Sequence, residues 1–208
     1  EADFDRGGRS VLGIRPLLWK NGWPVAGEVF KEGTYEIESE RRGYALELAV
    51  DFVRMEYTRH RFWEKDDTPV VPLKSQTLED VIETWPQGKI NVRIGDYMFR
   101  PHQKWTITAV PDGGGYLGGP YYKIVIEGTN RALAATADAE VVTVPEFTGA
   151  PEQLWRIDQL TDGTYRIMPK EVPGTDKELV LASVGDSTPS LGEFDMNSDN
   201  SKWNFRDH

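Results

Sequence analysis

The sequence predicts an all-β protein built from one unit that occurs three times. The unit ends in a short tryptophan motif, present as His102-Gln103-Lys104-Trp105, Glu152-Gln153-Leu154-Trp155 and Asn200-Ser201-Lys202-Trp203. A pair of β-rich segments precedes each motif, at 33–37 with 44–48, 121–125 with 131–135, and 163–167 with 179–182. A unit repeated at intervals of tens of residues buries its apolar face against its neighbours. We therefore expect three-fold internal pseudo-symmetry around a shared axis.

Composition limits the classes of partner and of site. The chain has 208 residues, a net charge of -10 and no cysteine. The negative charge argues against nucleic acid or an anionic membrane as a partner, because both would repel it. Without cysteine, neither disulfides nor thiolate metal sites can form, and we expect no cofactor and no metal. No apolar run reaches the length of a membrane span, no signal peptide is visible, and a first residue that is Glu1 suggests a piece of a longer product.

Residues 9–27 predict a β-hairpin ahead of the repeats. Asn21-Gly22 is a strong signal for a two-residue turn between a β-rich run and a returning segment. Trp19 and Trp23 make this hairpin very apolar, and an isolated hairpin is marginally stable in water. We therefore expect it to need a partner surface.

The first repeat is longer than the others, which predicts an insertion at about 56–89. This insertion holds the one clear helix signal, since Leu78, Val81, Ile82 and Trp85 share one helical face. Thr77 is the expected N-cap with Asp80 three residues on, and Pro86 is expected to end the helix. Further strands are expected at 90–94, 105–109, 141–144 and 155–158.

The three tryptophans are expected to fill the core, because a buried indole supplies a large apolar area. In the same motifs, Gln103 and Gln153 are expected to bond backbone groups of a neighbouring turn. The pattern resembles the ricin-type β-trefoil, a lectin-like fold of twelve strands, over residues 32–208. The resemblance implies repeats at about 32–110, 111–160 and 161–208, with Trp105, Trp155 and Trp203 as structural core.

In sugar-binding trefoils of this type, an acidic residue follows the second strand, an aromatic ring supplies a platform, and an Asn precedes the Gln. The resemblance places the acidic residue at Glu47, with Ala134 and Leu181 at that position in the other repeats, and no repeat keeps the full set. The implied carbohydrate-binding candidates are Glu47, Tyr97, His102, Phe147, Phe194 and Asn200. The alternative is that these aromatic rings only pack in the core or at its rim.

The segment from Gly8 to Val25 resembles the closing segment of glycoside hydrolase family 43 catalytic domains, especially the arabinan-degrading type. Those domains are five-bladed β-propellers, so the resemblance implies that residues 1–31 end a propeller and that residues 32–208 are an accessory domain. It implies a secreted, periplasmic or cell-surface bacterial hydrolase of the endo-arabinanase or arabinofuranosidase type. The expected partners are a polysaccharide or oligosaccharide and the catalytic propeller, in cis or as a cleaved chain.

This chain alone is expected to lack the paired carboxylates that glycoside hydrolysis needs. The glutamates at 28, 32, 36, 38 and 40 are expected on strand exteriors. Two other functions stay open: a purely structural trefoil that braces the propeller, and a protease inhibitor whose reactive loop would be 170–177.

Three further patterns are expected to carry no site. The glycines at 113, 115 and 118 have a dinucleotide-type spacing without a following helix, which predicts a loop. Asp195, Asn197 and Asp199 open like a calcium loop but lack its glycine and closing glutamate, which predicts a polar turn. The histidines at 60, 102 and 208 are scattered.

Overall fold

The protein is described from a computed structural model, which covers residues 2–3, 9–10, 15, 17–20, 22–27, 29–41, 44–50, 77–98, 100–116, 119–184 and 188–207. Most of the predicted insertion, residues 11–14, 16 and 21 of the predicted hairpin, Glu28, His60, His208 and Gly118 lie outside this part of the chain. No helix in the described part is both long and apolar enough to cross a membrane.

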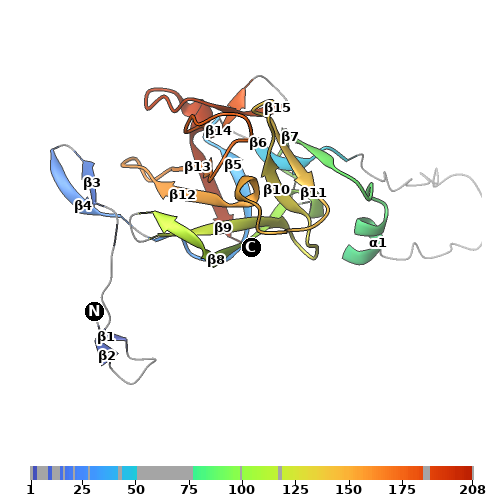
Figure 1. The fold of residues 1–208 in the computed structure, drawn as a ribbon, viewed down its shortest axis with the longest axis horizontal. Coiled ribbons are helices and arrows are strands. Elements are labelled where there is room, and N and C mark those ends of the chain that lie inside the picture. Colours follow the sequence, from blue (N-terminus) through green and yellow to red (C-terminus); the bar gives the residue numbers. More distant parts are fainter. Residues whose placement is uncertain are drawn as a thin grey trace, which may run out of the picture.

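The domain after residue 32 consists of strands β5 to β16 and is a β-trefoil (Figure 1). The first repeat holds β5 (Gly33–Ser39), β6 (Tyr44–Leu48), β7 (Ile90–Asp96) and β8 (Lys104–Tyr116). The second holds β9 (Gly119–Ile126), β10 (Ala132–Ala135), β11 (Val141–Val144) and β12 (Trp155–Gln159). The third holds β13 (Tyr165–Pro169), β14 (Val180–Val184), β15 (Thr188–Gly192) and β16 (Trp203–Asp207).

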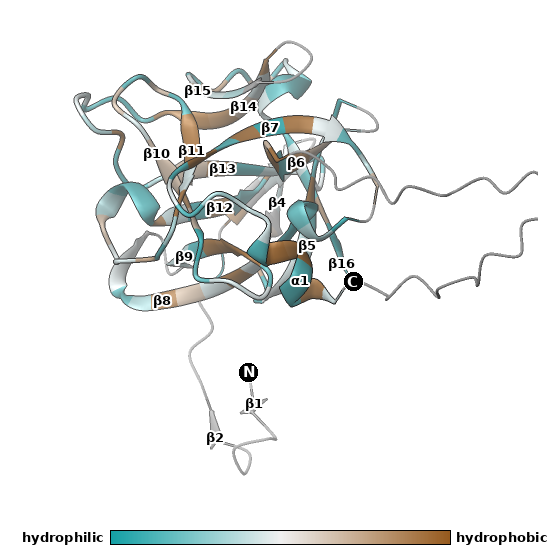
Figure 2. Ribbon diagram, turned by 90° about the vertical axis from the view of Figure 1, so that its right-hand side faces the viewer, coloured by the Kyte–Doolittle hydropathy of each residue, from teal (hydrophilic) through white to brown (hydrophobic). Residues whose placement is uncertain are grey.

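The first and last strands of each repeat form a closed barrel. Among the described residues, the ring of pairings runs β5–β8–β9–β12–β13–β16 and returns to β5. The two middle strands of each repeat pair as hairpins β6–β7, β10–β11 and β14–β15. A β11–β7 pairing and a bridge from Glu140 to Ser190 bring these hairpins together. Much of β14 is hydrophobic, β7 alternates hydrophobic with polar residues, and the connecting turns are mostly hydrophilic (Figure 2).

The repeat tryptophans occupy equivalent positions, as predicted. Trp105, Trp155 and Trp203 are fully buried. Each is the register partner, on the neighbouring strand, of a tyrosine in the first strand of its own repeat: Tyr35–Trp105, Tyr122–Trp155 and Tyr165–Trp203. Each indole Nε1 donates to the carbonyl of an equivalent leucine: Leu46 at 2.8 Å, Leu133 at 2.9 Å and Leu181 at 2.8 Å. A short 3₁₀ turn precedes each tryptophan, as η2 (Pro101–Gln103), η3 (Pro151–Gln153) and η4 (Asp199–Ser201).

Phe30 closes one end of the barrel. Its ring centroid lies 5.3 Å from that of Tyr35, 5.6 Å from that of Tyr122 and 5.7 Å from that of Tyr165. The Tyr122 hydroxyl also donates to the Phe30 carbonyl at 2.9 Å. The three equivalent tyrosines therefore surround one phenylalanine from the segment that leads into the trefoil.

The helix α1 (Leu78–Glu83) begins as predicted, with a capping box between Thr77 and Asp80. It ends three residues before Pro86, so Trp85 is not on its face but is buried in the turn that follows. The buried Arg131 holds this turn by donating to the carbonyls of Pro86 and Gly88, each at 2.7 Å. The insertion is thus fixed to the second repeat at its C-terminal end.

The N-terminal elements lie outside the trefoil. The short strands β1 (Ala2–Asp3) and β2 (Arg9–Ser10) pair with each other. The predicted hairpin is present as β3 (Leu17–Lys20) and β4 (Trp23–Ala26), with Gly22 at a φ of 80° in its turn. It projects from the side of the body in Figure 1, and its Trp19 and Trp23 are 61% and 74% exposed.

Two local expectations need correction. The glycine-rich segment is not a simple loop: the β8–β9 ladder shifts register after Val110 and resumes with Gly115 paired to Pro120. Glu36 is not on a strand exterior: it is 1% exposed, since side chains also cover the outer face of β5 at this point. The acidic turn at 195–199 is polar as expected, and the Asp195 side chain accepts the Asn197 N–H at 2.9 Å.

Candidate functional site

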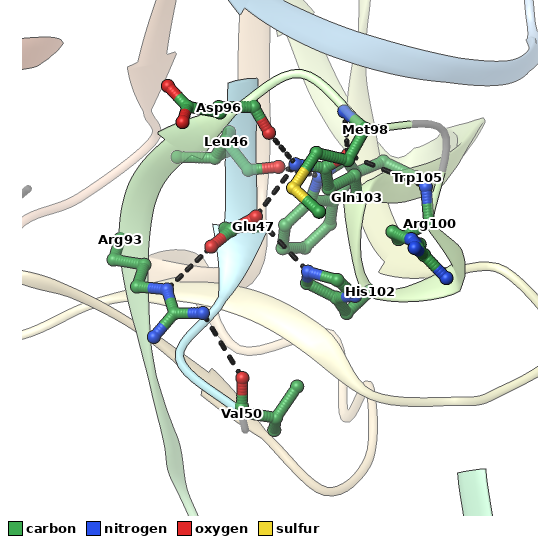
Figure 3. Close-up of polar contacts among 10 residues, drawn as sticks. All are labelled: Leu46, Glu47, Val50, Arg93, Asp96, Met98, Arg100, His102, Gln103 and Trp105. Atoms are coloured by element: carbon green, nitrogen blue, oxygen red, sulfur yellow. Dashed lines mark hydrogen bonds and ion pairs between the residues drawn. The ribbon is translucent and has the colours of Figure 1, made fainter. Parts of the chain in front are cut away.

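Glu47 of β6 is the centre of a buried polar cluster in the first repeat (Figure 3). Its Oε1 accepts from Arg93 Nε at 2.5 Å, and its Oε2 accepts from Gln103 Nε2 at 2.7 Å. His102 Nε2 lies 3.1 Å from the same Oε2. Glu47 is 3% exposed and His102 4%. The predicted acidic and histidine candidates therefore do lie together, but they contact each other and Arg93 rather than solvent.

The backbone is shaped to hold this carboxylate. Gly95 lies beside it on β7, and a Cβ at that position would overlap the Glu47 carboxylate, with Oε2 at 2.6 Å. Burial alone would raise the pKa of Glu47, but the hydrogen bonds from His102, Arg93 and Gln103 outweigh burial and lower this pKa below its ordinary value. Both carboxylate oxygens of Glu47 are thus held by hydrogen bonds within the cluster.

The two motif glutamines make equivalent hydrogen bonds to the backbone. Gln103 Oε1 accepts from the Met98 N–H at 2.9 Å, and its Nε2 also donates to the Asp96 carbonyl at 2.7 Å. Gln153 Oε1 accepts from the Thr148 N–H at 2.7 Å. Both glutamines bond the turn before their motif, as predicted.

The equivalent position in the third repeat differs from the one expected. Because the indoles bond Leu46, Leu133 and Leu181, the positions that match Glu47 are Ala134 and Ala182. The family resemblance places Leu181 there, which is one residue too early. Only the first repeat therefore carries an acid at this position.

Each predicted aromatic platform lies against a charged side chain. The Arg206 guanidinium lies 4.4 Å from the Tyr97 ring centroid, Lys123 Nζ 5.5 Å from that of Phe147, and Arg166 5.3 Å from that of Phe194. One face of each ring is therefore occupied by a cation. Burial, together with the neighbouring Glu36 carboxylate, raises the pKa of Tyr97 to about 12.

The three rings are partly exposed and Asn200 is exposed, so these candidates lie at the surface, unlike Glu47 and His102. The sugar-binding role of all six stays a prediction.

A cavity of about 350 Å³ lies beside Phe194 in the third repeat. Apolar groups contributed by Phe194, Ile157, Leu160 and Met196 form part of its wall. Its other lining residues are Leu17, Val29, Phe30, Gly119, Pro120, Tyr122, Arg156, Asp158, Gln159, Thr161, Asp162, Arg166 and Lys202. It combines an aromatic ring with carboxylates and guanidinium groups, a lining suited to a small polar ligand with apolar faces.

The charged groups of this cavity are held by one another. Asp158 on β12 pairs directly with Arg166 on β13, and its Oδ2 accepts from Arg166 Nη2 at 2.9 Å and from Arg156 at 2.6 Å. Lys202 lies 3.1 Å from Asp162, and this hydrogen bond raises the pKa of Lys202. The sequence analysis did not predict this group of ion pairs. The pattern that could have indicated it is Arg156-x-Asp158 in one strand, opposite Arg166 in the next.

No group of three or more His, Asp or Glu side chains in the described part of the chain is placed to hold a metal ion.

The comparisons with known proteins agree with the geometry. Residues 101–190 match a family model described as ricin-type beta-trefoil lectin domain-like. No curated protein sequence matches the chain. Among solved structures, a mosquitocidal holotoxin superposes with a TM-score of 0.58 at 14% identity over 89% of this chain, which spans 18% of the toxin chain.

Two further structures resemble the fold. The designed three-fold symmetric protein ThreeFoil gives a TM-score of 0.54 at 19% identity, covering 85% of this chain and 100% of that one. A Polyporus squamosus lectin, solved bound to a human-type influenza-binding epitope, gives 0.55 at 15% identity, covering 86% of this chain and 50% of that one. At these identities the structural matches speak for the fold alone. The structural matches and the three-fold barrel together show a β-trefoil fold, and residues 101–190 of it are similar to the ricin-type lectin domain.

Proposed function

We propose that this trefoil binds carbohydrate through the cavity beside Phe194. The observation that carries the proposal is the lining of that cavity, in which an aromatic ring stands near Asp158 and Asp162. Sugars offer C–H faces that pack on aromatic rings and hydroxyls that carboxylates accept. The lectin of Polyporus squamosus, which shares the fold, is described with a glycan bound, and this supports a sugar as the ligand class.

We further propose that the trefoil is the accessory portion of a bacterial glycoside hydrolase that acts on arabinan-type plant polysaccharide. The β3–β4 hairpin supports a missing partner domain, because Leu17, Trp19 and Trp23 are all more than half exposed. Exposed apolar clusters of this kind indicate an interaction surface. A catalytic propeller, in cis or as a cleaved chain, would cover it, and its substrate would place the protein outside the cell.

In this arrangement, a sugar-binding trefoil would raise the concentration of the hydrolase at its polymer.

The second candidate function is a structural trefoil that braces the propeller without a ligand. The closed cluster around Glu47 favours it, because the one acid at the expected sugar position is fully engaged. The two functions differ in one result, which is whether the isolated domain binds any polysaccharide.

Affinity gel electrophoresis with arabinan, xylan and galactan separates the two functions. We expect at least one polymer to retard the protein. Replacing Phe194 by alanine should weaken that retardation about tenfold or more, because a lost stacking contact of about 1.4 kcal/mol changes an affinity tenfold.

Phe147→Ala is the matched control, since Phe147 holds the equivalent place in the second repeat but does not line the cavity. It should leave retardation unchanged. Migration unaffected by any polymer would favour the structural function, and equal losses in both variants would place the site elsewhere.

A further inference from the structure

We propose that the cavity beside Phe194 selects an acidic sugar, one that carries a carboxylate such as a uronate. This inference deepens the proposed function and rests on it. The argument comes from the charges that line the cavity and from how they are paired.

The lining of the cavity holds the cations Arg156, Arg166 and Lys202 against the carboxylates Asp158 and Asp162. Arg156 and Arg166 both bind the single carboxylate of Asp158, at 2.6 Å and 2.9 Å from its Oδ2. Two guanidinium groups therefore converge on one carboxylate at the cavity wall. A guanidinium also presents several N–H donors in one plane, which suits a second carboxylate.

Both arginines are partly shielded from water. The Arg156 and Arg166 side chains are 15% and 27% exposed, against 28% for Asp158. Partial burial weakens the screening of their charge by solvent and salt. A ligand carboxylate at this point would therefore be attracted more strongly than at an open surface.

Another part of the cavity lining suits hydroxyl groups. Lys202 is held there by Asp162 at 3.1 Å and by Asp199 at 3.3 Å. The Asp162 side chain is 45% exposed, so its carboxylate can still accept from a hydroxyl. Phe194 and Met196 add apolar wall to the same cavity. A pyranose ring with one carboxylate matches a lining that combines positive, apolar and negative groups.

Because the protein is negatively charged, the test uses small saccharides rather than an acidic polymer. A long polyanion would be repelled by a chain of charge -10, whereas a single charged sugar responds mainly to the groups beside it. The test therefore uses monosaccharides: galacturonic acid, its methyl ester and galactose. The ester keeps the shape of the acid and removes its charge.

Isothermal titration calorimetry on the full chain should show galacturonate binding about tenfold more tightly than its methyl ester or galactose, a ratio equivalent to one added charge-assisted contact. This comparison needs no variant, so it does not depend on the folding of a mutant. Arg166→Gln should remove the preference for the acid. Lys123→Gln is the matched control, because Lys123 lies against Phe147 as Arg166 lies against Phe194, away from the cavity.

Three outcomes are informative. A preference for the acid that disappears in Arg166→Gln but persists in Lys123→Gln supports the inference. Equal affinity for acid, ester and galactose overturns the inference but leaves carbohydrate binding standing. Absence of binding for every monosaccharide, together with no retardation by any polymer, overturns both.

Discussion

Replacing Glu47 by alanine is expected to lower the free energy of unfolding by about 3 to 5 kcal/mol, the usual cost of removing one partner of a buried charged cluster. Arg93 and His102 would lose their shared acceptor, and Gln103 would lose one of its two. The alanines at 134 and 182 occupy the equivalent positions, so the backbone itself accepts the smaller side chain. Urea unfolding followed by circular dichroism measures the loss, and a change below about 1 kcal/mol would contradict a structural role.

Low pH should lower the free energy of unfolding of the wild-type protein, because it protonates the same Glu47 carboxylate. The pKa of Glu47 is lower in the folded protein than its ordinary value of 4.5, so its stabilising effect is fully present above that value. As the pH falls, the unfolded chain takes up the proton first, and the stabilisation is lost as the pH passes through the folded pKa. Glu47→Gln cannot titrate, so its stability should approach that of the wild type in acid. A constant difference between the two proteins from pH 7 to pH 3 would contradict this.

Replacing Trp155 by alanine is expected to cost about 3 to 5 kcal/mol, as for large aromatic residues removed from a core. The indole is fully buried, and its Nε1 satisfies the Leu133 carbonyl at 2.9 Å. Its removal would leave a cavity and a buried carbonyl without its partner. Guanidinium unfolding monitored by near-ultraviolet circular dichroism gives the change in stability.

Trp23→Ala is the control for this substitution. Trp23 is 74% exposed on the β3–β4 hairpin, so its loss should change the free energy of unfolding of the trefoil by no more than about 0.5 kcal/mol. Similar losses at Trp155 and Trp23 would mean that the repeat tryptophans do not form the core.

The trefoil could be predicted from sequence because its signals are local and repeated. Each tryptophan follows a turn of fixed length and pairs with a tyrosine at the start of its repeat, and Trp203 keeps this geometry although Ser201 replaces the glutamine. The indole and its bond to a leucine carbonyl therefore fix the repeat more than the amide does. By contrast, the early end of helix α1 could not be predicted from the local sequence. The turn that follows the helix is held by Arg131, which lies far away along the chain.

The site could be predicted only in part, since its decisive contacts are long-range. The motif indicated Glu47 and His102, but the partner that closes the cluster is Arg93, on the next strand after the insertion. Gly95 provides the space for the carboxylate, and no local pattern indicates that. The burial of Glu36 has the same origin, because Tyr97 approaches it from the segment after β7 and Arg206 is its register partner on β16.

The central claim, that the cavity beside Phe194 binds sugar, is tested most directly by mapping backbone amide chemical shifts during titration with the tightest-binding saccharide. We predict that the largest shifts fall on residues 158–162, Arg166 and Phe194, with little change around Glu47 and His102. Shifts concentrated at Glu47 and His102, or no saturable shifts with any saccharide, would contradict it.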